Sequence, residues 1–194
     1  MKKLLFAMLL MGAVVTNAQS QEVISSSTGN GYVGDFSNEV KVNFFNLIAL
    51  GSIEIGYERF LSSDHSLDLQ LLLNDRFGFN NENKGKKYKT NSAQVSMNFY
   101  FGGNNTDQLP RGRFYIYPLA KLRFGEFEET VDGGVTTTNM NAFMFGAGAG
   151  YKWEISDHFA FGPYASVTRG FSDEVADRFA RIEVNAGFSL GYRF

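Results

Sequence analysis

The chain has 194 residues, of which 44% are hydrophobic and 20% are charged, and it contains 21 glycines, 20 phenylalanines and no cysteine. The lack of cysteine excludes a disulfide scaffold, a thiolate metal site and a cysteine nucleophile. A formal net charge of −2 gives no basic surface for nucleic acid, so we expect no nucleic-acid partner. No apolar run after residue 18 is as long as a membrane-spanning helix, so a membrane protein of this sequence would have to be a closed β-barrel.

Residues 1–18 have the pattern of a secretory signal peptide. Lys2 and Lys3 form a positive start, residues 4–15 form an apolar core, and small residues precede Gln19, where we expect the mature chain to begin. The apolar core is short for a spanning helix, and a buried N-terminal helix is the alternative. The sequence therefore predicts an exported protein whose leader is cleaved.

Residues 19–38 are rich in serine, glycine and asparagine, and we interpret them as a flexible lead-in. From residue 39 to residue 194 the apolar residues recur mainly with a period of two. This period predicts β-strands, because successive side chains of a strand point to opposite faces. We therefore expect one all-β domain over 39–194.

Eight alternating segments follow in chain order. In "EVKVNFFN" and "SIEIGYERF" apolar residues alternate with Lys41, Glu54 and Glu58, and in "SLDLQLLLND" leucines alternate with Asp68 and Gln70. The segment "NSAQVSMNFYFG" alternates apolar residues with serine, glutamine and asparagine. The predicted strands lie near 39–47, 52–61, 66–79, 90–102, 113–126, 139–155, 158–171 and 179–194.

The second half of the domain repeats the pattern. The segment 113–126 is noisier, and Pro118 removes one ladder hydrogen bond from it. In "NAFMFGAGAGYKWEI" a face of aromatic and small apolar residues opposes a face of glycines, Lys152 and Glu154. In "ARIEVNAGFSLGYRF" every second residue is apolar and the others are polar or glycine, over a length that exceeds an average soluble strand.

The connections differ between the two ends of these strands. "LSSDH" and "SDH" are short turns at one end, and each contains a Ser-Asp-His tripeptide that ends at His65 or His158. At the other end lie longer polar loops at 80–90, 127–138 and 172–179. Short turns at one end and long loops at the other are typical of outer-membrane barrels.

The polar face of the strands identifies the inside of the predicted barrel. A lipocalin-like soluble barrel is apolar inside and polar outside, and a membrane barrel is the reverse. Here the polar face is rich in glycine and serine, which suits a crowded interior, and the aromatic residues of the apolar face gather near both strand ends. We therefore predict an eight-stranded antiparallel up-and-down transmembrane β-barrel with a polar lumen and an apolar exterior.

The polar face also carries charges of both signs, which we expect to pair across the lumen as a structural cluster. Metal-ligand spacing is absent and the glycine-rich segment does not open a helix, so we predict no metal site, no cofactor and no catalytic residue. The predicted lumen charges are Lys41, Glu54, Glu58, Asp68, Arg76, Lys121, Arg123, Lys152, Glu154, Arg181, Glu183 and Arg193.

Several motifs resemble those of a known family. They are the leader that ends in Ala18-Gln19, "GYERF" at 56–60, "FGAGAGY" at 145–151, and the terminal Tyr192 and Phe194. On these motifs residues 39–194 resemble the small eight-stranded outer-membrane barrels of the OmpA/OmpX type, particularly those of Bacteroidota. The resemblance implies that the protein is embedded in the outer membrane of a Gram-negative bacterium and contacts its lipid. It also implies that Tyr192 and Phe194 form the signal read by the barrel-assembly machinery.

Three functions are compatible with this sequence. A structural or surface-interaction barrel without catalysis is favoured by the lack of a catalytic pattern, and its loops at 80–90, 127–138 and 172–179 would be free to contact a partner outside. An outer-membrane lipid-modifying enzyme, such as a lipid A deacylase, would need its base from His65 or His158, which we interpret as turn residues. A narrow, porin-like passive channel could run along the glycine-rich lumen.

Overall fold

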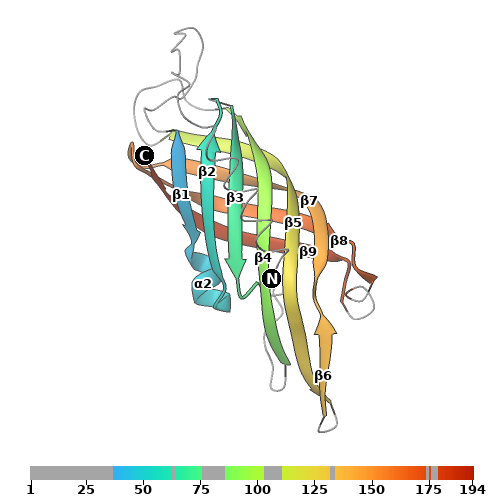
Figure 1. Ribbon diagram of the computed structural model, residues 1–194. Coiled ribbons are helices and arrows are strands. Elements are labelled where there is room, and N and C mark those ends of the chain that lie inside the picture. The colour runs from blue at the N-terminus through green and yellow to red at the C-terminus, as the bar shows by residue number, and fades with distance from the viewer. Residues whose placement is uncertain are drawn as a thin grey trace, which may run out of the picture. The chain divides into compact units, whose positions relative to one another are not determined.

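β-Strands dominate the computed structural model of the chain (Figure 1). The structure describes residues 37–62, 64–75, 86–102, 111–131, 134–173, 175 and 179–194. The predicted signal peptide and nearly all of the predicted lead-in lie outside these residues. In chain order the elements are β1 (Asn38–Asn43), α2 (Phe44–Leu50), β2 (Ile53–Phe60), β3 (His65–Leu73), β4 (Lys86–Phe101), β5 (Arg111–Val131), β6 (Gly134–Asn139), β7 (Ala142–Glu154), β8 (Phe159–Gly170) and β9 (Ile182–Arg193).

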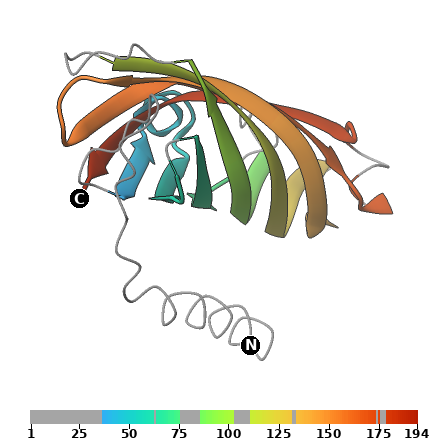
Figure 2. The same cartoon turned by 90° about the horizontal axis from the view of Figure 1, so that it is seen from above.

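All of these strands except β6 close into an antiparallel barrel. Neighbours pair in the order β1, β2, β3, β4, β5, β7, β8 and β9, and β9 pairs with β1 again. The closing ladder joins Glu39 to Arg193, so the C-terminus lies beside the start of β1 (Figure 1). The view from above shows the sheet curling back on itself (Figure 2). The predicted eight-stranded antiparallel barrel is therefore confirmed.

β4 and β5 are longer than the other strands and continue beyond them. β3 pairs with β4 only as far as Asn91, whereas β4 and β5 stay paired as far as Lys86 and Glu129. β6 pairs with the end of β5, and the three strand ends extend past the rest of the barrel at the bottom of Figure 1. We call them the projecting sheet, which comprises 86–90 of β4, 126–131 of β5 and 134–139 of β6.

The projecting sheet corrects two predicted loops. Part of the loop 80–90 is strand from residue 86 onward, and the loop 127–138 consists mostly of the end of β5 and of β6. The physical reason is local, because "EETV" and "GVTTT" place β-branched residues on both sides of an Asp-Gly pair, which favours a hairpin over an open loop. The described part of the third predicted loop, 172–179, contains no strand.

Helix α2 corrects the first predicted strand, 39–47, because β1 ends at Asn43. Continued alternation would place Phe45 in the polar interior and Asn46 on the apolar exterior. The helix instead buries Asn46 and leaves Phe44, Phe45, Leu47 and Ile48 exposed. Asn43 caps the first turn by accepting a hydrogen bond from the Asn46 N–H, and Gly51, with φ at 65°, ends the helix in the left-handed region.

α2 also fills a gap in the barrel wall beside β9. β1 pairs with β9 only as far as Ser189, so residues 182–188 have no partner on β1. α2 packs against this part of β9, and the rings of Phe45 and Phe188 lie 6.4 Å apart. The helix therefore takes the place of strand pairing along the loop-side half of this seam.

The outside of the barrel is apolar on every strand. Exposed large hydrophobic residues, one from each barrel strand, are Val40, Ile55, Leu71, Val95, Ile116, Phe145, Val167 and Leu190. Aromatic rings meet near both strand ends: Trp153 contacts Tyr151 and Phe161 at the short-turn end, and Phe143 stacks on Phe171 at the loop end. Among the described residues, no helix has the length and apolar character needed to cross a membrane.

Glycines on the inner face of β7 make room for tyrosines of β5. A Cβ atom on Gly148 would overlap the ring of Tyr117, and one on Gly150 would overlap the ring of Tyr115. The two tyrosine rings stack with 5.7 Å between their centroids. They belong to a buried layer formed by Tyr100, Tyr115, Tyr117 and Leu119.

The substitution Gly148→Ala should destabilise the barrel by about 1–3 kcal/mol, because overpacking a filled core forces side chains off their rotamers. The new methyl group would also press on the Ala165 carbonyl oxygen of β8, so the backbone gives no relief. Urea unfolding in lipid vesicles measures the change. The control is Ala147→Val, which adds bulk on the exposed face and should stay within about 0.5 kcal/mol of wild type. Equal stability of Gly148→Ala and wild type would show that the tyrosine layer has spare room.

Candidate functional site

The inside of the barrel is filled with charged and polar side chains. Because successive residues of a strand point to opposite faces, the residues that alternate with the apolar exterior point inward. Acidic and basic groups nearly balance there, so the cost of burying each charge can be offset by pairing. The buried charged residues among those described are Glu39, Lys41, Glu54, Glu58, Asp68, Asp75, Arg113, Lys121, Arg123, Lys152, Glu154, Glu183 and Arg193.

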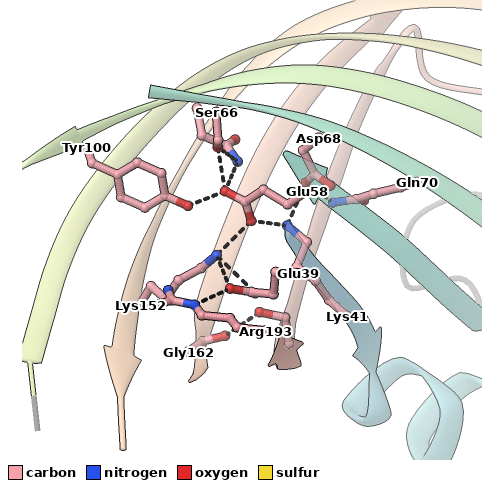
Figure 3. Close-up of polar contacts among 12 residues, drawn as sticks. Glu39, Lys41, Glu58, Ser66, Asp68, Gln70, Tyr100, Lys152, Gly162 and Arg193 are labelled. Carbon is pink, nitrogen blue, oxygen red and sulfur yellow. Dashed lines mark hydrogen bonds and ion pairs between the residues drawn. The ribbon is translucent and has the colours of Figure 1, made fainter. Parts of the chain in front are cut away.

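A first group of interior charges surrounds Glu58 of β2 (Figure 3). The Glu58 carboxylate lies 3.0 Å from Nζ of Lys41 and 2.6 Å from Nζ of Lys152. Lys41 also reaches Asp68 at 2.7 Å. The carboxylate therefore joins ammonium groups from β1 and β7, which are not neighbours in the sheet. We call this group the Glu58 cluster, which comprises Glu39, Lys41, Glu58, Asp68, Lys152, Glu154 and Arg193.

Neutral side chains complete the surroundings of Glu58. Ser66 Oγ and the Tyr100 hydroxyl donate hydrogen bonds to Oε1, and Asn98 Nδ2 donates to the same oxygen at 3.0 Å. Glu58 is 0% exposed, so these donors and the two ammonium groups take the place of water. Each oxygen of this carboxylate is thus satisfied by the protein alone.

The Glu58 cluster also reaches the last strand. Lys152 Nζ lies 3.0 and 3.2 Å from the two oxygens of Glu39, and Arg193 Nε donates to Glu39 at 2.9 Å. Arg193 also reaches Glu154 at 3.1 Å. These pairs connect β1, β7 and β9 inside the barrel, close to the ladder that closes it.

A second group of charges, the Glu183 cluster, comprises Asp75, Lys121, Arg123 and Glu183. Lys121 Nζ lies 2.9 Å from Asp75 and 3.1 Å from Glu183. Arg123 lies 3.0 Å from Asp75 and 2.7 Å from Glu183. Each cation contacts both anions, and the four residues come from β5, β9 and the end of β3, so this cluster also spans strands that do not pair with one another.

Glu54 is held by neutral groups in the part of the chain that the structure describes. Asn43 Nδ2 donates to it at 2.9 Å, Asn46 Nδ2 at 2.6 Å and the Tyr164 hydroxyl at 2.5 Å. Asn43 ends β1 and Asn46 lies in the first turn of α2. The helix therefore supplies an amide to this buried carboxylate, which a continued strand would have directed outward.

The structure places most of the predicted lumen charges in the interior, namely Lys41, Glu54, Glu58, Asp68, Lys121, Arg123, Lys152, Glu154, Glu183 and Arg193. Arg76 lies outside the described residues. The prediction that Arg181 lies in the lumen is wrong. Its side chain is 56% exposed, and it pairs with Asp173, 3.8 Å away at the surface. β9 begins at Ile182, so strand alternation does not direct Arg181 inward.

Three buried charges escaped the sequence analysis. Glu39 stands at the first position of the predicted barrel, Asp75 follows the irregular end of a leucine-rich strand, and Arg113 opens the noisiest segment. Cross-strand register could have revealed two of them, because facing residues share a face. Glu39 is opposite Glu58, and Arg113 is opposite Lys152.

Long side chains from different walls meet in the middle of the barrel and fill it. Arg193 and Arg123 are 1% exposed, and Lys121 and Leu119 are 2% exposed. These residues belong to both charge clusters and to the tyrosine layer. A barrel of eight strands is expected to have an interior that side chains can fill.

The two Ser-Asp-His turns make different contacts. In the first turn, Ser62 Oγ lies 2.6 Å from Nδ1 of His65, and both groups are at the surface. In the second, His158 Nδ1 lies 3.2 Å from the carbonyl oxygen of Arg193, and the ring stacks on Tyr192 with 5.5 Å between centroids. The same tripeptide therefore serves two different local arrangements, which favours the interpretation as turns over a repeated catalytic motif.

The arrangement of strands resembles that of solved barrels. The N-terminal β-barrel domain of Pseudomonas aeruginosa OprF matches with a TM-score of 0.51 and 16% identity, over 81% of this chain and 95% of that one. This chain shares its fold. Neisserial surface protein A (NspA) gives a TM-score of 0.45 and 13% identity over 80% and 91% of the two chains. Ail, the attachment invasion locus protein of Yersinia pestis, gives 0.39 and 12% over 81% and 95%.

No family model and no curated protein matches this sequence. The fold implied by the OmpA/OmpX resemblance, a small eight-stranded barrel, is confirmed by the strand order and by the likeness to the OprF barrel domain. Membership of a Bacteroidota type stays a prediction.

The substitution Lys152→Met should destabilise the barrel by about 3–5 kcal/mol, because it removes a cation from two buried carboxylates, Glu39 and Glu58. Urea unfolding in lipid vesicles, read from the mobility of unheated samples on gels, measures the loss. The control is Lys89→Met, which breaks a pair with Glu128 whose side chains are 59% and 26% exposed and should cost less than about 1 kcal/mol. Equal losses in the two variants would contradict a special role for the Glu58 cluster.

Proposed function

We propose that this chain is an integral outer-membrane β-barrel with a structural and surface-interaction role and without catalysis of its own. The observation that carries the proposal is the distribution of polarity over a closed barrel. Every barrel strand exposes large hydrophobic side chains outward, while most of the charged side chains are buried inside, where nearly all of them form ion pairs. A soluble barrel has the opposite distribution. A bilayer accepts such strands because all their backbone groups can pair within a closed sheet.

The ends of the barrel support an orientation in the membrane. Outer-membrane barrels carry short turns on the periplasmic side and longer connections outside. The turns between β2 and β3 and between β7 and β8 are short, and the projecting sheet extends from the opposite end. We infer that the projecting sheet stands above the outer surface and that the short turns face the periplasm.

The projecting sheet is the surface that we propose for a partner. Its outer face carries exposed polar groups and the ion pair between Lys89 and Glu128. A polar hollow of about 300 Å³ lies at its base, lined by Gly125, Glu126, Thr137, Asn139 and Asn141. The described end of the 172–179 connection packs against the inner face of the same sheet, where Phe179 lies 5.1 Å from Phe127 between ring centroids. This packing gives the surface a fixed shape that a partner could recognise.

The filled interior supports a structural role over a channel. The Glu58 cluster, the tyrosine layer and the Glu183 cluster are all buried, so water has little access to the barrel axis in this conformation. The histidines support no enzyme role, because each lies in a short turn and contacts its own turn or the last strand. A lipid-modifying enzyme would instead need its base close to the outer-leaflet headgroups.

The last strand supports the proposed route of assembly. Tyr192 and Phe194 are 47% and 50% exposed on the outer face, where the barrel-assembly machinery could read them during insertion. Arg193 between them is buried in the Glu58 cluster. The assembly signal at Tyr192 and Phe194, the Bacteroidota type and the cleaved leader are proposals that rest on the sequence alone.

Fractionation of the producing cells tests the location. The mature chain should occur in the outer-membrane fraction and should migrate differently on SDS gels before and after boiling, because a closed, ion-paired barrel resists unfolding by detergent. A chain that stays in the periplasm and migrates identically under both conditions would refute the proposal. The Gly148→Ala and Lys152→Met variants should lose the folded band at lower temperature than wild type.

Proteolysis of intact cells tests the orientation. A protease added outside should cut within the projecting sheet and leave the barrel in the membrane, because the exposed β6 edge lies above the proposed bilayer. The turns at His65 and His158 should be cut only after the outer membrane is opened. Cleavage at these turns in intact cells, with the projecting sheet protected, would show the reverse orientation.

A further inference from the structure

Arg169 of β8 is a charged residue on the apolar outer face. In the described strands β1, β2, β3, β7, β8 and β9, the outward positions that carry a permanent charge are Arg59 and Arg169. The cross-strand neighbours of Arg169 are Phe145 and Ile182, which are 54% and 60% exposed. A guanidinium group in such surroundings is costly unless an anion meets it.

The two outward arginines differ in what they bind. Arg59 donates to Ser37 Oγ and to Asn38 Oδ1, both at 2.8 Å, near the short-turn end. Within the described part of the chain, Arg169 forms no ion pair and no side-chain hydrogen bond with another residue. Its guanidinium lies instead over the ring of Phe171, with Cζ 5.8 Å from the centroid. The hydrogen-bond donors of Arg169 therefore remain open to a ligand.

The contact with Phe171 shows where the guanidinium points. β8 runs from the short-turn end to the loop end, and Phe171 follows Arg169 by two residues, just beyond the end of the strand. The side chain of Arg169 therefore extends toward the loop end. Long basic side chains extend in this way from an apolar surface toward the polar headgroups of a bilayer.

The backbone of a second arginine, Arg181, lies at the same rim. The Gly170 N–H donates to the Arg181 carbonyl oxygen at 2.8 Å, which places Arg181 beside the end of β8. The ion pair of Arg181 with Asp173 is long, at 3.8 Å, and the Asp173 carboxylate is fully exposed. An exposed pair of this kind contributes little, so Arg181 can turn to a stronger anion.

We propose that Arg169 and Arg181 bind the phosphate group of a phosphate-bearing lipid in the outer leaflet, and that Phe145, Val167 and Val184, which lie on the membrane side of the guanidinium, contact its acyl chain. The inference rests on the membrane placement proposed above. Two arginines suit a phosphate, because each guanidinium can donate two parallel hydrogen bonds to its oxygens. The ligand is a lipid and not free phosphate, because the apolar residues beside Arg169 are continuous with the lipid-facing exterior.

Titration with lipid A, which carries phosphate groups and acyl chains, tests the site. The mature chain is refolded in zwitterionic detergent, its barrel is verified by the gel shift, and bound lipid A is counted by native mass spectrometry. Arg169→Gln should weaken binding about tenfold, as expected for the loss of charge-assisted hydrogen bonds. Arg181→Gln is a second variant at the same rim and should weaken binding about threefold or more.

The matched control is Lys87→Gln, which removes one exposed positive charge from the projecting sheet, away from the proposed site. It should bind lipid A as wild type does. Equal binding by wild type and Arg169→Gln would overturn the lipid site, and so would an equal loss in Arg169→Gln and Lys87→Gln, which would indicate unspecific charge attraction. If wild type forms no heat-modifiable barrel, the membrane placement fails and the lipid site fails with it, so the two failures are distinguishable.

Discussion

A carboxylate that water cannot reach is the constraint on which the interior of this barrel depends. Glu58 is 0% exposed, and a buried charge is tolerated only when opposite charges and hydrogen-bond donors surround it. Its donors come from β1, β3, β4 and β7, in the form of Lys41, Ser66, Asn98, Tyr100 and Lys152. They can converge only after strands far apart in the chain have met. The Glu58 cluster therefore stabilises the closed barrel in particular and penalises an open or misregistered sheet.

Closure is achieved differently on the loop side of the seam between β1 and β9. There β1 stops at Asn43, and helix α2 packs against residues 182–188 of β9. The interruption has an electrostatic reason, because Asn43 and Asn46 both donate to Glu54. A continued strand would expose Asn46 to lipid and leave Glu54 with fewer donors. The need for hydrogen bonds to Glu54 thus determines the backbone structure of the wall here, and regular strand pairing between β1 and β9 is lost beyond Asn43.

Periodicity predicted most of the fold and most of the interior charges, because a period of two assigns every residue of a strand to one face. It failed where another interaction was stronger. The strand 39–47 was interrupted by the capping asparagine of α2, and the loop 127–138 became strand through its β-branched residues. Arg181 was misplaced because the alternation begins only at Ile182. Asp75 was missed because it lies after the last residue of β3, where its partners Lys121 and Arg123 from β5 determine its direction.

The two ends of the barrel differ in what holds them. At the short-turn end, the ring of His158 stacks on Tyr192. The carbonyl oxygen of His158 also accepts a hydrogen bond from the Arg193 N–H at 2.7 Å, so the turn is attached to the last strand. Arg193 in turn is buried against Glu39 and Glu154, so the terminal strand is fixed from both faces. At the loop end, the projecting sheet exposes polar side chains, and Arg169 forms no ion pair or side-chain hydrogen bond within the described part of the chain. Polar groups that already have a partner within the chain stabilise the fold, whereas polar groups that lack one can bind a ligand. The chemistry available for recognition is therefore concentrated at the loop end and on the outer face beside it.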